Sequence, residues 1–174
     1  MATSTVLLPP ASAVLPDGSS GNLAPALNRI QGTETNPKKH FLVLAYDGAG
    51  AKEHAWWTFR LPADYASGGT LKILWMYNST TAGNVKWQAT VGAITAADAD
   101  TPVEHASAAA ATVTDAINTT EARRLITSSI TLTMDSAAAG DLIFLCLFRD
   151  SADGSDTAAA ADAEVLAVAF EYTS

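Results

Sequence analysis

A period of two in its apolar residues constrains this 174-residue chain more than any other feature. It is clearest over residues 70–78 and 85–91, where every second residue is apolar, as in a strand with one face in a core. The connection between them, residues 78–84, is rich in Ser, Thr, Gly and Asn, which predicts a hairpin turn. The apolar faces consist of Leu71, Ile73, Trp75 and Tyr77 in the first segment and of Val85, Trp87, Ala89 and Val91 in the second.

Further segments of strand length recur along the chain, and no strong 3.6-residue period accompanies them. Short strands at such spacings are typical of an all-β sandwich. We therefore expect an all-β fold, a jelly-roll β-sandwich over residues 40–174. The additional predicted strands are 40–47, 55–61, 112–117, 123–134, 141–150 and 163–173.

Residues 1–39 differ from the rest, because they hold five of the seven prolines. Proline at that density excludes a helix or a central strand, so this segment is expected to be an extended N-terminal arm. Its apolar groups could pack back on the arm's own domain or dock on a neighbouring chain. We expect the arm to be the main attachment element. Its predicted partner-binding residues are Leu7, Leu8, Val14, Leu15, Leu23, Leu27 and Ile30.

The net charge of −8 argues against binding to nucleic acid or to an anionic membrane surface, which both draw on clustered Lys and Arg. No apolar run is long enough to span a bilayer. The N-terminus lacks the basic region of a signal peptide, so synthesis in the cytoplasm is expected. The single cysteine, Cys146, lies in the apolar run 142–148 and is interpreted as a buried hydrophobe.

No catalytic motif is visible, so we expect neither an enzyme nor a bound cofactor. His40, His54 and His105 have no metal-ligand spacing, which predicts no metal site. The acidic segment 150–162 does not fit the spacing of a calcium-binding loop, and a solvated hairpin loop is the preferred interpretation.

The four tryptophans allow two interpretations. Trp56, Trp57, Trp75 and Trp87 lie in predicted strands with apolar neighbours, which favours packing in the core. If several were exposed in a row, they could stack on sugar rings, and the protein would be a carbohydrate-binding β-sandwich module.

Strand and turn patterns over residues 53–173 resemble the small jelly-roll virion proteins of tailed bacteriophages. Members of this group are typically trimeric sandwiches displayed on virions, as capsid decoration proteins or as tail and fibre components. The resemblance implies a cement protein on the capsid surface that binds the major capsid protein or another virion protein. A tail or fibre module is the alternative. The similar segments are 57–73, 84–89, 139–144, 148–150 and 163–168.

A homotrimer is also expected. Segments 142–148 and 41–46 are apolar on both faces. A single sandwich core buries only one face of each strand, and the surplus apolar surface usually marks a subunit interface. The alternative is that the N-terminal arm covers the second face within one chain.

Overall fold

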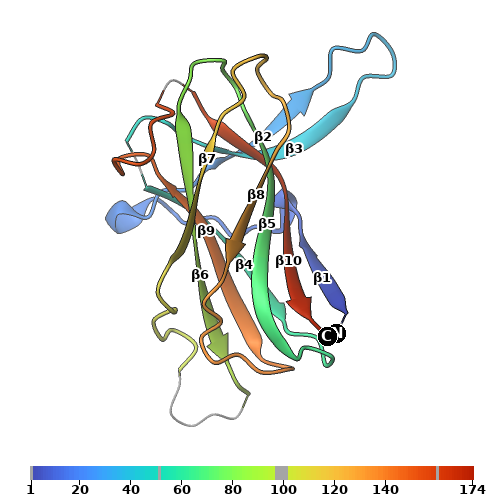
Figure 1. Ribbon diagram of the computed structural model, residues 1–174, viewed down its shortest axis with the longest axis vertical. Helices are drawn as coiled ribbons and strands as arrows, with labels where there is room; N and C mark the ends of the chain where they lie inside the picture. The colour runs from blue at the N-terminus through green and yellow to red at the C-terminus, as the bar shows by residue number, and fades with distance from the viewer. Residues whose placement is uncertain (1, 51, 97–101, 160) are drawn as a thin grey trace.

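Two antiparallel sheets pack face to face and enclose a single core (Figure 1). The structure, a computed structural model, describes residues 2–50, 52–96, 102–159 and 161–174. One sheet has the strand order β2-β3-β10-β5-β8, with β1 paired to β10 as a sixth strand, and the other has the order β4-β9-β6-β7. The strands are β1 (Thr3–Leu8), β2 (Ala26–Gln31), β3 (His40–Tyr46), β4 (Lys52–Arg60), β5 (Ser67–Tyr77), β6 (Asn84–Ile94), β7 (Ala111–Ala116), β8 (Ile126–Thr131), β9 (Leu142–Asp150) and β10 (Ala163–Thr173).

The predicted β-sandwich class is confirmed, and each of the eight strands expected after residue 39 is present. The alternation also predicted the buried faces correctly. In β5 the side chains of Leu71, Ile73 and Trp75 are buried, and in β6 those of Val85 and Trp87 are buried. These residues face the opposite sheet, so the period of two identifies the inside of the sandwich.

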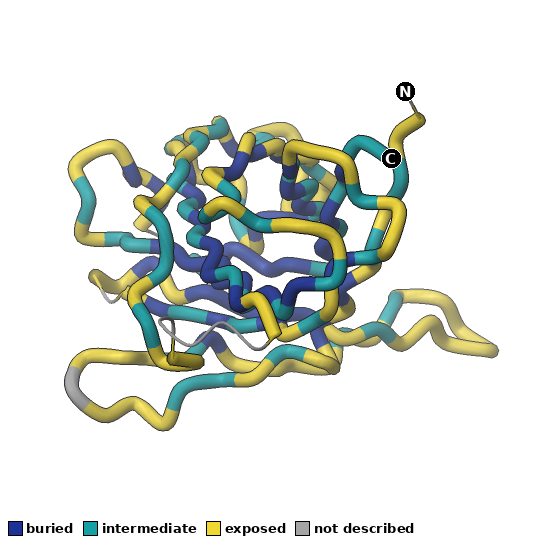
Figure 2. The backbone as a smooth tube through the Cα atoms, turned by 90° about the horizontal axis from the view of Figure 1, so that it is seen from below, coloured by how far each residue is buried: buried dark blue, intermediate teal, exposed yellow. Residues whose placement is uncertain are grey.

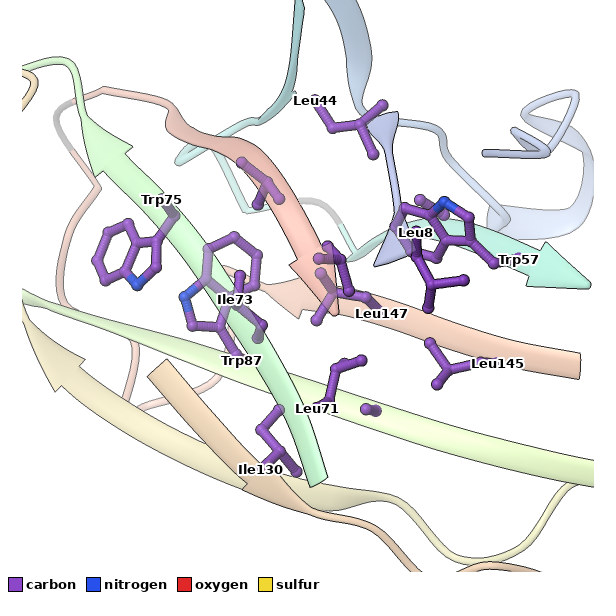
Figure 3. Close-up of a cluster of buried hydrophobic side chains, with 14 of the residues drawn as sticks. Leu8, Leu44, Trp57, Leu71, Ile73, Trp75, Trp87, Ile130, Leu145 and Leu147 are labelled. Carbon is purple, nitrogen blue, oxygen red and sulfur yellow. The ribbon is translucent and has the colours of Figure 1, made fainter. Parts of the chain in front are cut away.

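The expected hairpin over residues 70–91 is wrong, because β5 and β6 belong to different sheets. Their connection crosses the end of the sandwich, where Asn78 donates its backbone N–H to the Asp162 carbonyl at 3.2 Å. Trp75 and Trp87 therefore meet across the core, edge to face, with ring centroids 5.5 Å apart. Figure 3 shows the two rings side by side within the buried cluster, and Figure 2 shows the buried backbone inside a shell of exposed loops.

The N-terminal segment is extended, but it lies along its own sandwich and adds strands to it. β1 pairs with β10 from Thr3 opposite Thr173 to Leu8 opposite Val168, and β2 pairs with β3. Between them, single β-bridges join Val14 to Trp56 and Leu23 to Glu53 at the edge of β4. Residue 39 is therefore not a boundary between an arm and a sandwich. The five prolines before residue 40 all lie outside these strands, in the connections between them, where no ladder hydrogen bond is lost.

The connection from β9 to β10 is not the solvated hairpin loop that the sequence suggested, because these strands also lie in different sheets. Arg149 is fully buried in β9, and its guanidinium contacts both carboxylate oxygens of Asp156, at 2.8 and 2.9 Å. The same guanidinium donates to the backbone carbonyls of Tyr46 and Ala158. This buried ion pair fixes the loop over the end of the core.

Candidate functional site

A pocket of about 220 Å³ opens on the outer face of the β4-β9-β6-β7 sheet. It combines an aromatic floor with a wall of polar side chains from one loop, which is the composition expected of a small-ligand site. Its lining residues are Trp56, Gly92, Val103, Glu104, His105, Ser107 and Phe144.

Strand register builds the floor of the pocket. Trp56 lies opposite Cys146 in the β4–β9 pair, and Phe144 lies opposite both Thr58 of β4 and Gly92 of β6. Trp56 and Phe144 are therefore diagonal neighbours on one face of adjacent strands, where long side chains can reach each other. Their neighbours in sequence, Trp57 and Leu145, point the other way into the core.

The floor continues beyond the pocket along the same face. The ring of His54 stacks on Phe148 at 5.2 Å between centroids, and the Lys52 ammonium lies 5.7 Å from the Phe148 ring centroid. Burial lowers the pKa of His54, and the nearby positive charge of Lys52 lowers it further. At neutral pH this part of the face therefore presents a neutral imidazole among aromatic rings.

Residues 103–107, in the connection between β6 and β7, form the wall of the pocket, and hydrogen bonds hold them in place. The His105 Nε2 atom lies 3.0 Å from Asp135 Oδ2, and the same carboxylate oxygen accepts the backbone N–H of Ala93 at 3.0 Å. Gly92 allows the loop to approach closely, because a Cβ atom at this position would lie 3.2 Å from the Ser107 hydroxyl oxygen. The polar wall is thus anchored to the strand that forms the floor.

This arrangement can bind an amphipathic ligand. The half-exposed indole of Trp56 offers an apolar surface, while Glu104, His105 and Ser107 offer acceptors and donors beside it. Among the described lining residues Glu104 is the only carboxylate.

A second hollow, of about 270 Å³, lies near the paired chain ends between β1, β5 and β10. Its walls are mainly threonines and glycines, with the carboxylate of Glu171 and the ring of Tyr172. The Tyr172 ring belongs to the core cluster and is buried, so this hollow offers no exposed aromatic surface for stacking.

The seven predicted partner-binding residues do not form one surface. Leu8 is 4% exposed and belongs to the core, which contradicts a binding role for its side chain. Leu15 and Ile30 are half-buried. Leu7, Val14, Leu23 and Leu27 are exposed, and they lie at β1, at the edge of β4 and on β2.

The remaining predicted sites have clear positions. Cys146 is buried, as expected, and burial raises the pKa of its thiol. His40 begins β3, His54 lies within β4 and His105 lies in the pocket wall. Within the described ranges, no group of three or more His, Cys, Asp or Glu side chains is arranged to hold a metal ion. Nor do the described residues include a helix that could cross a membrane.

Three of the four tryptophans are fully buried, so an exposed row of tryptophans is not present. Trp56 alone reaches the surface, and it does so in the pocket. Because side chains alternate along a strand, the adjacent residues Trp56 and Trp57 lie on opposite faces of β4. The partners of Trp56 in the pocket wall come from a loop about 50 residues later in the chain, and no sequence signal connected the two.

The chain matches no protein-family model and no curated protein. Among solved structures, it is similar to the exo-β-1,3-galactanase of Phanerochaete chrysosporium with galactose, at 9% identity and a TM-score of 0.43. That match covers 96% of this chain but 29% of the galactanase. It is also similar to TmCBM61 in complex with β-1,4-galactotriose, at 9% identity and a TM-score of 0.40, over 99% of this chain and 88% of the other. At these values neither likeness assigns a function.

Proposed function

We propose that the protein is a non-catalytic carbohydrate-binding β-sandwich and that the Trp56 pocket is its binding site. The observation that carries the proposal is the position of Trp56, the one tryptophan at the surface, beside the polar side chains of Glu104, His105 and Ser107. Sugars have apolar C–H faces and polar hydroxyl edges, which match these two parts of the pocket.

Binding would combine stacking with hydrogen bonding. The apolar face of a sugar ring would lie on the Trp56 indole, with Phe144 beneath, and ring hydroxyls would face the loop wall. The wall is positioned before the ligand arrives, because Asp135 holds His105, and this lowers the entropic cost of binding. The volume lies below the ordinary range of drug-sized sites, roughly 300–1,000 Å³, so a terminal sugar or a short segment fits best.

The test is a glycan array with the full chain, followed by titration of the best ligand. Trp57, Trp75 and Trp87 are buried, so a ligand-induced change in tryptophan fluorescence should come from Trp56. We expect Trp56→Ala to abolish that change and to weaken binding at least tenfold. The control is Leu125→Ala, which alters an exposed side chain outside the pocket lining. Equal binding by the Trp56 variant, or no binding to any glycan, would contradict the proposal.

A second candidate function is a virion structural protein that decorates and cements a capsid, or serves as a tail or fibre module. The observation in its favour is that four large apolar side chains before residue 30 are exposed. Burying each against a capsid protein would contribute about 1.5–3 kcal/mol. A protein that binds only the assembled shell stabilises it by mass action. These side chains are Leu7, Val14, Leu23 and Leu27.

Deleting the N-terminal segment cannot test this candidate, because β1 and β2 are strands of the sandwich. The double variant Leu7→Ser and Val14→Ser removes apolar surface without touching the core. We expect it to remain folded but to lose binding to purified particles, while Leu125→Ser, at another exposed leucine, binds normally. Labelling on intact virions separates a head location from a tail location. Unchanged binding by the double variant would exclude attachment through these residues.

A further inference from the structure

Strands β2 and β3, with the turn that joins them, form a two-stranded ribbon over residues 26–46 that projects from the sandwich (Figure 1). β3 pairs with β10 only through Tyr46, Ala45 and Leu44. From Val168 onward, β10 pairs with β1 on that side instead. Along most of the ribbon, neither outer edge therefore pairs with another described strand.

The projecting ribbon carries apolar side chains on both of its faces. Leu27 is 46% exposed and Leu42 is 40% exposed, and the strand register places them on the same face. On the other face Ile30 lies directly opposite Phe41, and both are half-buried. An isolated two-stranded ribbon is marginally stable in water, and exposed apolar groups on it favour docking on another surface.

The charge of the ribbon indicates what that surface is. The ribbon contains three cationic residues, Arg29, Lys38 and Lys39, and one carboxylate, Glu34, so its formal charge is +2. The whole chain carries −8, so the part outside the ribbon is strongly acidic. The ribbon is therefore complementary in charge to the body of a molecule like its own.

We propose that the β2–β3 ribbon is a clasp that docks on the sandwich body of a second copy of this chain. From Val43 to the turn, about eight residues at roughly 3.3 Å each give a reach of about 25 Å, enough to extend well onto a neighbouring domain. Contact of a ribbon on a different surface of the next copy is heterologous, and such contacts close into a ring if the rotation between copies closes and otherwise build an open filament. The homotrimer expected from the sequence is one such ring. The contact is separate from the Trp56 pocket and does not depend on sugar binding.

The first test is the molar mass of the full chain by light scattering and sedimentation in low salt. We expect a mass of two or more chains, where one chain is 18.0 kDa. The double variant Leu27→Glu and Leu42→Glu should sediment as a monomer. The matched control is Leu125→Glu, which places the same charge at a leucine that is 61% exposed outside the ribbon, and it should assemble normally. A monomeric wild-type protein at about 100 μM would overturn the proposal.

The second test covers the case in which the leucine variants do not fold. Lys38→Glu with Arg29→Glu reverses two exposed charges of the ribbon, keeps the Lys39–Glu34 ion pair of the turn, and should leave thermal unfolding of the monomer unchanged. We expect this reversal to raise the dissociation constant of the assembly at least tenfold in low salt, with a smaller effect in high salt. An unchanged dissociation constant would overturn the proposal.

A zero-length carbodiimide crosslinker applied to a mixture of unlabelled and ¹⁵N-labelled chains locates the contact. Crosslinks that join Lys38 or Lys39 of one chain to a carboxylate of the other are expected. An assembly whose interchain crosslinks all lie outside the ribbon would show that a different surface mediates the association.

Discussion

The substitution Asp156→Asn tests the role of the buried Arg149–Asp156 ion pair in the stability of the fold. The carboxylate contacts the guanidinium through both oxygens and accepts the backbone N–H of Lys86 at 3.2 Å. Arg149 is fully buried, and its remaining contacts are to the backbone carbonyls of Tyr46 and Ala158. The asparagine variant keeps the shape of the side chain but leaves a buried cation without a counter-charge.

Removing one partner of a buried ion pair costs about 3–5 kcal/mol. For a chain of this size, each kcal/mol lowers Tm by about 2–4 °C, so we expect Tm to fall by about 6–20 °C. The assay is urea unfolding followed by tryptophan fluorescence, which reports on three tryptophans buried in the core. The denaturation midpoint should decrease while the slope stays constant.

The control for this measurement is Asp153→Asn in the same loop. Asp153 forms an ion pair with Lys86 at 2.7 Å, but its carboxylate is accessible to solvent. Surface pairs contribute little, so the midpoint of this variant should match that of the wild type. If the two variants unfold at the same urea concentration, the buried pair does not hold the loop as described.

Two further predictions concern buried titratable groups. Cys146 is 1% exposed, and burial raises the pKa of its thiol, so iodoacetamide at pH 8 should modify it only when denaturant is added. Rapid modification of the folded protein would contradict its burial. Burial raises the pKa of Glu53, and the nearby charges of Asp47 and Asp162 raise it further. At pH values between the ordinary and the raised pKa, the folded state therefore binds more protons than the unfolded state. The free energy of unfolding falls as pH rises through that window. Glu53→Gln should therefore raise the free energy of unfolding above that of the wild type at pH 7 but not below about pH 4. Urea titrations that show the same difference between variant and wild type at both pH values would refute this.

Strand positions and buried faces could be predicted from the sequence because both follow from the period of two. The alternation in residues 70–78 states which side chains lie inside, and those side chains are buried. It does not state which strand is the neighbour. The connections from β5 to β6 and from β9 to β10 each lead from one sheet to the other. A segment rich in turn residues has the same composition whether it joins two paired strands or two strands of different sheets.

Pairing between strands that are far apart in the chain is the other feature that the sequence does not predict. Prolines indicated an extended segment before residue 40, but the partner of β1 is β10, at the far end of the chain. In the same way, residues 55–61 place Trp56 opposite the core face, whereas His105 and Asp135 meet through two separate loops. Contacts of this kind are decided by tertiary packing and leave no local pattern.

The pairing of β1 with β10 also has a consequence for the order in which the protein can fold. β1 leaves the ribosome well before its hydrogen-bonding partner β10, so its edge stays unpaired until β10 has emerged. Contacts so distant in sequence slow folding, and unpaired strands in partly folded chains promote aggregation. The prolines at positions 9 and 10, directly after β1, limit how far any mispaired strand could extend. The larger sheet can therefore be completed only after β10 has been synthesised.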